Sequence, residues 1–147
     1  MAETASQSIT IHASPEHCYA VVTDFERYPQ WAKDVKEATV VARDDAGRAA
    51  EVEYRASALG RSTHYTLGYD YGAAPEKLSW RLVRGDIMRA IDGAYTLVPS
   101  ATDPDGTDVT YDLSIELVVP LPGFVKRRAE VRILNTVKEL KARAEAS

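Results

Sequence analysis

Residues 122–147 read PGFVKRRAEVRILNTVKELKARAEAS, and this stretch has the clearest helical period of the chain. Its apolar residues return at steps of three or four, and at about 100° per residue they cover an arc of roughly 120°. An arc of that width is typical of a helix laid on a core. We therefore expect one long C-terminal helix. The residues on its apolar arc are Val125, Ala129, Ile133, Val137, Leu140 and Ala144.

The chain before this helix mostly alternates apolar and polar residues, which is the period of a β-strand. Gly93 lies inside one alternating stretch, and we expect a bend or bulge there because glycine tolerates both. Short turns separate most of the strands, so they should form an antiparallel meander whose apolar face the long helix covers. The predicted strands are residues 8–13, 35–43, 49–58, 64–71, 78–83, 87–98 and 109–119.

Two short helices are expected between the first strand and the second. Ser14, Pro15 and Glu16 are typical of a helix start, because serine caps the helix, proline suits its first position and glutamate complements its dipole. Pro29 disfavours helix at the residue before it, so the helical region should end near Tyr28. A second capping position within the region favours two short helices over one. The predicted fold class is therefore α+β.

The length and the amino-acid composition of the chain suit a single domain over residues 1–147. Residues 1–6 are expected to be flexible. A net charge of −4 argues against nucleic acid or an anionic membrane as the main partner, since both need clustered positive charge. No segment approaches the ~18 apolar residues that span a bilayer, so no stable membrane insertion is expected. The N-terminus has no basic region or apolar run, which predicts a cytoplasmic protein. The oligomeric state is left open, and a homodimer is one state to test.

No metal site and no cofactor are expected from the sequence. Cys18 is the only cysteine, and the spacing of the three histidines matches no metal site. Cys18 falls on the apolar side of its predicted helix, where inert packing is expected. His64 falls on the face of its strand opposite the tyrosines, so its side chain should be exposed. No catalytic set assembles from these residues.

The strand alternation places six aromatic residues on one face of the sheet, namely Tyr54, Tyr65, Tyr69, Trp80, Tyr95 and Tyr111. Tyrosine buries an apolar ring, but its hydroxyl needs a hydrogen-bond partner. Several inward hydroxyls predict a cavity that suits an oxygenated ring compound or a polar lipid. The alternative is an ordinary core, with the hydroxyls bonded to backbone or water. On the helix side, Ile133, Val137 and Leu140 are expected to line the cavity, with Thr136 at its margin.

The stretch from Ser14 to Trp31, SPEHCYAVVTDFERYPQW, resembles the N-terminal signature of the START-like (SRPBCC) superfamily. Residues 93–95, 106–111 and 119–124 are also similar to its bacterial polyketide cyclase/dehydrase and coenzyme-Q-binding-like members. The resemblance covers residues 7–145 and implies the helix-grip fold, a seven-stranded antiparallel sheet wrapped around a long C-terminal helix with an internal cavity. It also implies binding of lipids, sterols, polyketides, hormones or quinones, with catalysis in only some members.

Three functional hypotheses follow, and the first is favoured. It is a binding protein that encloses a small hydrophobic ligand, such as a lipid, a polyketide or a quinone-like compound, between sheet and helix. The second is a polyketide aromatase/cyclase or dehydratase, in which a cavity arginine and hydroxyl groups polarise a carbonyl and assist the loss of water. The third is a quinone- or ribosome-associated adaptor, against which the acidic net charge argues. The sequence leaves open whether the protein is an enzyme.

Overall fold

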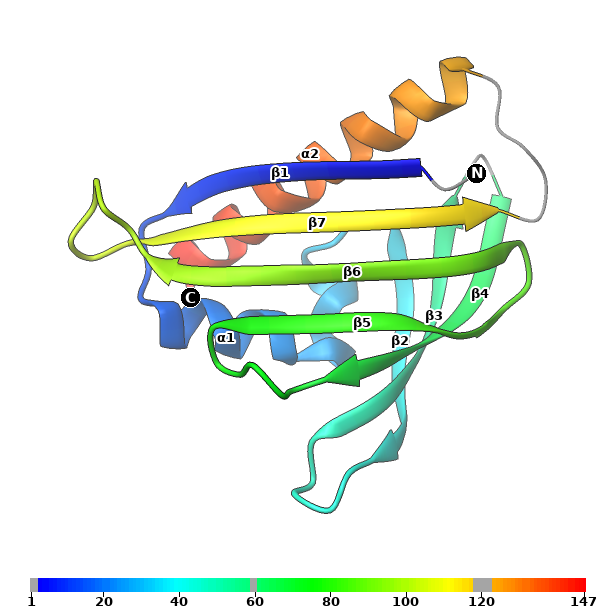
Figure 1. The fold of residues 1–147 in the computed structure, drawn as a ribbon, viewed down its shortest axis with the longest axis horizontal. Coiled ribbons are helices and arrows are strands. Elements are labelled where there is room, and N and C mark those ends of the chain that lie inside the picture. Colours follow the sequence, from blue (N-terminus) through cyan, green and yellow to red (C-terminus); the bar gives the residue numbers. More distant parts are fainter. Residues whose placement is uncertain (1–2, 59–60, 118–122) are drawn as a thin grey trace.

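The alternating stretches form one antiparallel sheet of seven strands in the order β1-β7-β6-β5-β4-β3-β2, as the helix-grip fold requires (Figure 1). The structure is a computed structural model and describes residues 3–58, 61–117 and 123–147. Figure 1 shows β2, β3 and β4 turned across the direction of β5, β6 and β7, so the sheet is strongly curved. The strands are β1 Glu3–Ile11, β2 Val35–Arg43, β3 Ala49–Ala58, β4 Arg61–Asp70, β5 Lys77–Gly85, β6 Met88–Pro99 and β7 Thr107–Leu117.

Strand β1 begins at Glu3, earlier than the predicted start at residue 8. Its polar side chains explain the difference, because they form hydrogen bonds with side chains of β7. The Ser6 hydroxyl, for example, donates to Asp112 Oδ1 over 2.6 Å. Residues 3–6 therefore belong to the sheet, although the sequence suggests a flexible segment there.

Two short helices follow β1, as predicted. Helix α1 spans Pro15–Thr23, and the 3₁₀ helix η1 spans Phe25–Gln30. The Ser14 hydroxyl caps α1 by accepting a hydrogen bond of 3.1 Å from a backbone N–H of the first turn. The Tyr28 hydroxyl donates to the carbonyl oxygen of Val22 over 2.5 Å, which ties η1 back to α1.

The predicted bend at Gly93 is wrong. Strands β6 and β7 stay in register around Gly93, and the irregularity in their pairing lies between Met88 and Ala90 instead. Gly93 provides room for a large side chain on the neighbouring strand. A β-carbon built on Gly93 would come within 2.5 Å of the Trp80 indole nitrogen. The absence of a side chain at Gly93 therefore serves the packing of Trp80.

The long C-terminal helix, α2, spans Gly123–Ala146 and confirms the prediction from its apolar period. It packs on β1 and on α1, and Figure 1 shows it crossing behind β1. Its described side chains, from residue 135 onward, follow the predicted arc: Val137, Leu140 and Ala144 are buried, whereas Lys138 is exposed. Among the helices that the structure describes, none combines the length and apolarity that crossing a membrane requires.

Polar contacts tie the last turns of α2 to the end of β1. The Lys141 ammonium donates to the carbonyl oxygen of Thr10 over 3.0 Å, and the backbone N–H of His12 donates to Glu145 Oε2 over 2.8 Å. The His12 Nδ1 atom also lies 2.8 Å from Asp103 Oδ2. This contact raises the pKa of His12 above its ordinary 6.5 and lowers the pKa of Asp103 below its ordinary 3.8.

The His12–Asp103 pair should make stability depend on pH. A raised histidine pKa contributes stability that is fully present below 6.5 and is lost as the pH rises through the folded-state pKa. A lowered aspartate pKa contributes stability that is present above 3.8 and is lost as the pH falls through the folded-state pKa. The Tm difference between the unmodified protein and His12→Ala should therefore be largest between these two values. A Tm difference that does not change with pH would contradict the pairing.

Candidate ligand-binding site

The structure brings the six predicted aromatic residues together on the core-facing side of the sheet. We call Tyr54, Tyr65, Tyr69, Trp80, Tyr95 and Tyr111 the aromatic cluster. Trp80 lies at its centre, within ring-contact distance of residues from three other strands. The ring centroids are separated by 5.5 Å for Tyr54–Tyr65, 6.0 Å for Tyr69–Trp80, 5.3 Å for Trp80–Tyr95, 5.9 Å for Trp80–Tyr111 and 4.8 Å for Tyr95–Tyr111.

Two aromatic residues of η1 extend the aromatic cluster, and the sequence-based site prediction missed both. The Phe25 ring lies 4.3 Å from the Tyr69 ring, and the Tyr28 ring lies 6.1 Å from the Tyr54 ring. Both residues are buried. Their spacing of three residues was the available signal, because it places two side chains on the same side of a helical turn.

The hydroxyl groups of the aromatic cluster are of two kinds. The hydroxyls of Tyr54 and Tyr69 form a hydrogen bond with each other over 2.5 Å. Those of Tyr65, Tyr95 and Tyr111 have no hydrogen-bond partner among the residues that the structure describes. Three phenol groups on the core-facing side of the sheet are thus free to bond to another molecule.

Burial raises the pKa of every tyrosine in the aromatic cluster. For Tyr65 the pKa is raised to about 12. A phenol with so high a pKa stays protonated at neutral pH, so it donates a hydrogen bond and does not serve as a base. The aromatic cluster is therefore a set of neutral hydrogen-bond donors.

Exposure also divides the aromatic cluster. Tyr65, Tyr69 and Tyr111 are half-buried, whereas the other three members are buried. Leu113, the next residue of β7 on the same face as Tyr111, is also only partly buried. Part of the core-facing side of the sheet therefore keeps accessible surface.

The helix residues predicted to line a cavity differ in their surroundings. Val137 and Leu140 are 0% exposed, so other protein atoms pack around them on all sides. Thr136 is half-buried, which agrees with a marginal position. The side chain of Ile133 lies outside the described residues. A direct ligand contact stays a prediction for all four.

The other candidate groups are the potential metal ligands, His64 and Cys18. In the described ranges, no three His, Cys, Asp or Glu side chains are grouped so that they could hold a metal ion. The His64 side chain is exposed, as predicted. Cys18 is buried, and burial raises the pKa of its thiol, which fits inert packing.

Comparisons with solved structures show proteins of similar fold. A structure described as a START superfamily protein from Mycobacterium smegmatis is similar over 97% of each chain, with 29% identity and a TM-score of 0.89. A protein from Thermus thermophilus is similar over 97% of each chain, with 23% identity and a TM-score of 0.80. The Zhui aromatase/cyclase from a Streptomyces species has 12% identity and a TM-score of 0.80, covering 99% of this chain and 94% of its own. At such low identities, the last two show a shared fold alone.

The amino-acid sequence, compared with models of protein families, identifies the family. A comparison with curated proteins gave no match. A family model described as "Polyketide cyclase / dehydrase and lipid transport" matches residues 2–145, nearly the whole chain. The chain therefore belongs to the polyketide cyclase/dehydrase and lipid transport family of START-like proteins.

Proposed function

We propose that the protein encloses a small hydrophobic ligand, bearing at least one oxygen atom, between the sheet and α2. The observation that carries this proposal is that the hydroxyls of Tyr65, Tyr95 and Tyr111 have no hydrogen-bond partner within the described part of the chain. Fully enclosed side-chain N and O atoms of the described residues all have hydrogen-bond partners. The three oxygens are therefore taken to border open space, where a ligand oxygen accepts their hydrogen bonds.

The surroundings of these hydroxyls support an apolar ligand body. Trp80 lies between Tyr69 and Tyr95, and Leu113 adds aliphatic surface nearby. A ligand that covers these hydroxyls without accepting their hydrogen bonds would leave buried donors unpaired, which is costly, so a ligand that supplies an acceptor is favoured over a pure hydrocarbon. The proposed contacts are Tyr54, Tyr65, Tyr69, Trp80, Tyr95 and Tyr111 from the sheet, and Ile133 and Thr136 from α2. Val137 and Leu140 have no exposed surface, so they are proposed to support the site from the helix side.

The proposed ligand class is a lipid, a polyketide or a quinone-like compound. The family description, which names polyketide cyclases and lipid transport, supports this range. These compounds combine an apolar body with carbonyl or hydroxyl oxygens, which matches neutral donors set among aromatic rings. A cytoplasmic location and a homodimer stay predictions.

Polyketide cyclisation or dehydration is the second candidate. The observation that favours it is the hydrogen bond between the Tyr54 and Tyr69 hydroxyls, because a phenol held in this way can polarise a substrate carbonyl. Tyr54→Phe should then abolish turnover of a polyketide-like substrate while its binding persists. If the unmodified protein binds the polyketide-like substrate but does not convert it, the enzyme hypothesis is rejected and the binding function remains.

The binding proposal is tested with Trp31→Phe, which leaves Trp80 as the one tryptophan and as a fluorescent reporter inside the aromatic cluster. We expect 1-naphthol to change the Trp80 emission saturably and to bind more tightly than naphthalene. In this background, Tyr95→Phe and Tyr111→Phe should each weaken naphthol binding by about 0.5–1.5 kcal/mol, the net value of one hydrogen bond. Naphthalene binding should not change.

Tyr19→Phe is the matched control, because it removes a phenol hydroxyl that lies outside the aromatic cluster. It should leave naphthol binding unchanged. Equal affinities of naphthol and naphthalene in every variant would contradict the role of the hydroxyls. A lack of saturation with either compound would count against an internal site altogether.

A further inference from the structure

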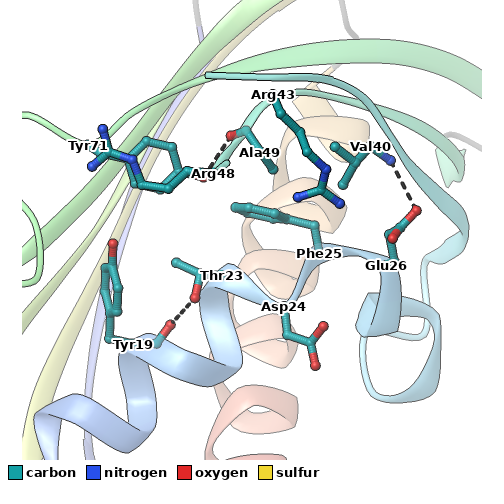
Figure 2. Close-up of a pocket in the computed structure, with 10 residues that line it drawn as sticks. All are labelled: Tyr19, Thr23, Asp24, Phe25, Glu26, Val40, Arg43, Arg48, Ala49 and Tyr71. Carbon is teal, nitrogen blue, oxygen red and sulfur yellow. Dashed lines mark hydrogen bonds between the residues drawn. The ribbon is translucent and has the colours of Figure 1, made fainter. Parts of the chain in front are cut away.

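A separate pocket of about 340 Å³ lies where α1 and η1 meet the β2–β3 hairpin (Figure 2). Tyr19 and Phe25 line it from the helical side, and Arg43 at the end of β2, Arg48 in the β2–β3 turn and Tyr71 just after β4 line it from the other side. Phe25 is buried, and its ring also contacts Tyr69 of the aromatic cluster. This residue therefore stands between the pocket and the proposed internal site.

The aromatic wall of the pocket is held in place by specific contacts. The Tyr71 hydroxyl donates to the carbonyl oxygen of Ala49 over 2.7 Å. The Arg48 guanidinium lies 4.7 Å from the centroid of the Tyr71 ring, and its Nε is 2.8 Å from Asp44 Oδ2. Arg48 and Tyr71 are thus already ordered, so a ligand would not have to fix them.

The two carboxylates of the pocket already have partners. Asp24 Oδ2 lies 3.1 Å from Arg27 Nε. Glu26 Oε2 accepts a hydrogen bond of 3.3 Å from the backbone N–H of Val40, an interaction drawn in Figure 2. The ion pair with Arg27 reduces the competition of Asp24 for a cation inside the pocket, whereas the neutral partner of Glu26 leaves its charge in place.

Arg43 is a positively charged residue of the pocket that still has N–H groups available for hydrogen bonds. Its Nη1 donates over 3.0 Å to the carbonyl oxygen of Gly47, a neutral acceptor. In the described part of the chain, no carboxylate forms an ion pair with it. A guanidinium has five N–H donors in a planar fork that matches a carboxylate. Figure 2 shows this guanidinium turned into the pocket above Phe25.

Tyr19 adds a neutral donor to the opposite side of the pocket. Its hydroxyl has no hydrogen-bond partner among the described residues, and Figure 2 shows it directed toward the pocket. The pocket thus presents a guanidinium and a phenol, with the half-buried aromatic ring of Tyr71 among its lining side chains. Its volume lies near the lower end of the range for small-molecule sites.

We propose that this pocket is a second ligand site, which takes a compact aromatic carboxylate. The ligand carboxylate binds Arg43 through paired hydrogen bonds, and its ring lies beside Tyr71. A hydroxyl at the far end of the ligand accepts a hydrogen bond from Tyr19. The site differs from the internal one in taking an anion, and it does not depend on the internal cavity.

The test is a titration of the full ¹⁵N-labelled chain with 4-hydroxybenzoate, followed through amide chemical shifts. We expect saturable shifts in residues 19–26 and 40–49, with a dissociation constant of about 1 mM or lower for a ligand of this size. Arg43→Gln should weaken binding at least about tenfold, because it removes charge-assisted hydrogen bonds. The neutral 4-hydroxybenzyl alcohol should bind at least about tenfold more weakly for the same reason.

Arg81→Gln is the matched control, since it also removes an exposed arginine but lies on β5 away from the pocket. It should not change the affinity. Tyr95→Phe, which alters the internal site, should not change it either. An affinity that is insensitive to Arg43→Gln, shifts centred on the aromatic cluster, or no saturable shift at all would each overturn the proposal. Naphthol binding would be unaffected by these outcomes, so the two sites are tested separately.

Discussion

Replacing Leu140 with alanine is expected to lower the free energy of unfolding by about 2–5 kcal/mol. Leu140 is 0% exposed and belongs to the same core cluster as Ile11, Cys18 and Val22. The truncation loses the transfer free energy of the removed atoms, and it leaves a cavity that close-packed neighbours fill only partly. Urea unfolding followed by circular dichroism measures the change.

Lys138→Ala is the matched control on the same helix, because Lys138 is exposed. Its effect should stay within about 0.5 kcal/mol. A loss below about 1 kcal/mol for Leu140→Ala would contradict solid packing, since a side chain beside open space has fewer contacts to lose. The result therefore shows whether this part of α2 supports the proposed cavity from behind or lines it.

Gly93→Ala is expected to destabilise the protein by about 1–3 kcal/mol, although it adds only one methyl group. The new β-carbon would lie within 2.5 Å of Trp80 Nε1 and Cζ2, a separation that real contacts do not reach. Trp80 is buried against Tyr95 and Tyr111, so its ring can move only by displacing other rings. Urea unfolding measures the loss, and near-ultraviolet circular dichroism reports the displaced aromatic rings.

Gly68→Ala is the control, because Gly68 also lies in a strand but its new β-carbon would not overlap a buried ring. The nearest atom to its new β-carbon is Val83 Cγ2 at 3.2 Å, on an exposed side chain that can turn away. Gly93→Ala should also be less harmful in a Trp80→Phe background, because the smaller ring leaves room. Additive effects of the two substitutions would mean that contact with Trp80 is not the cause.

Much of the fold could be predicted because its determinants are local. The apolar steps from Val125 to Ala144 predict α2, and the alternation around Tyr54, Tyr69 and Tyr111 places these rings on one face. A period of two also fixes which strand residues share a face, so the aromatic cluster could be anticipated. The resemblance of the Ser14–Trp31 stretch then supplied the helix-grip topology.

The features that the sequence did not reveal depend on contacts between distant segments. Gly93 suggests a bend until Trp80 is known to lie beside it in the sheet. The pocket around Arg43 exists only because the β2–β3 hairpin packs near α1 and η1. The core position of Leu140 likewise requires the placement of α2 against β1. No local period encodes such pairings.

Native mass spectrometry, after incubation with an equimolar mixture of a fatty acid, a naphthoquinone and a naphthol, tests the proposed internal site. A matched variant, Leu113→Trp, places an indole on the core-facing side of β7 opposite Gly93. The internal-site proposal predicts a one-to-one complex with at least one of these compounds in the unmodified protein and its loss in Leu113→Trp. Only uncomplexed protein, or a complex that Leu113→Trp leaves intact, would contradict it.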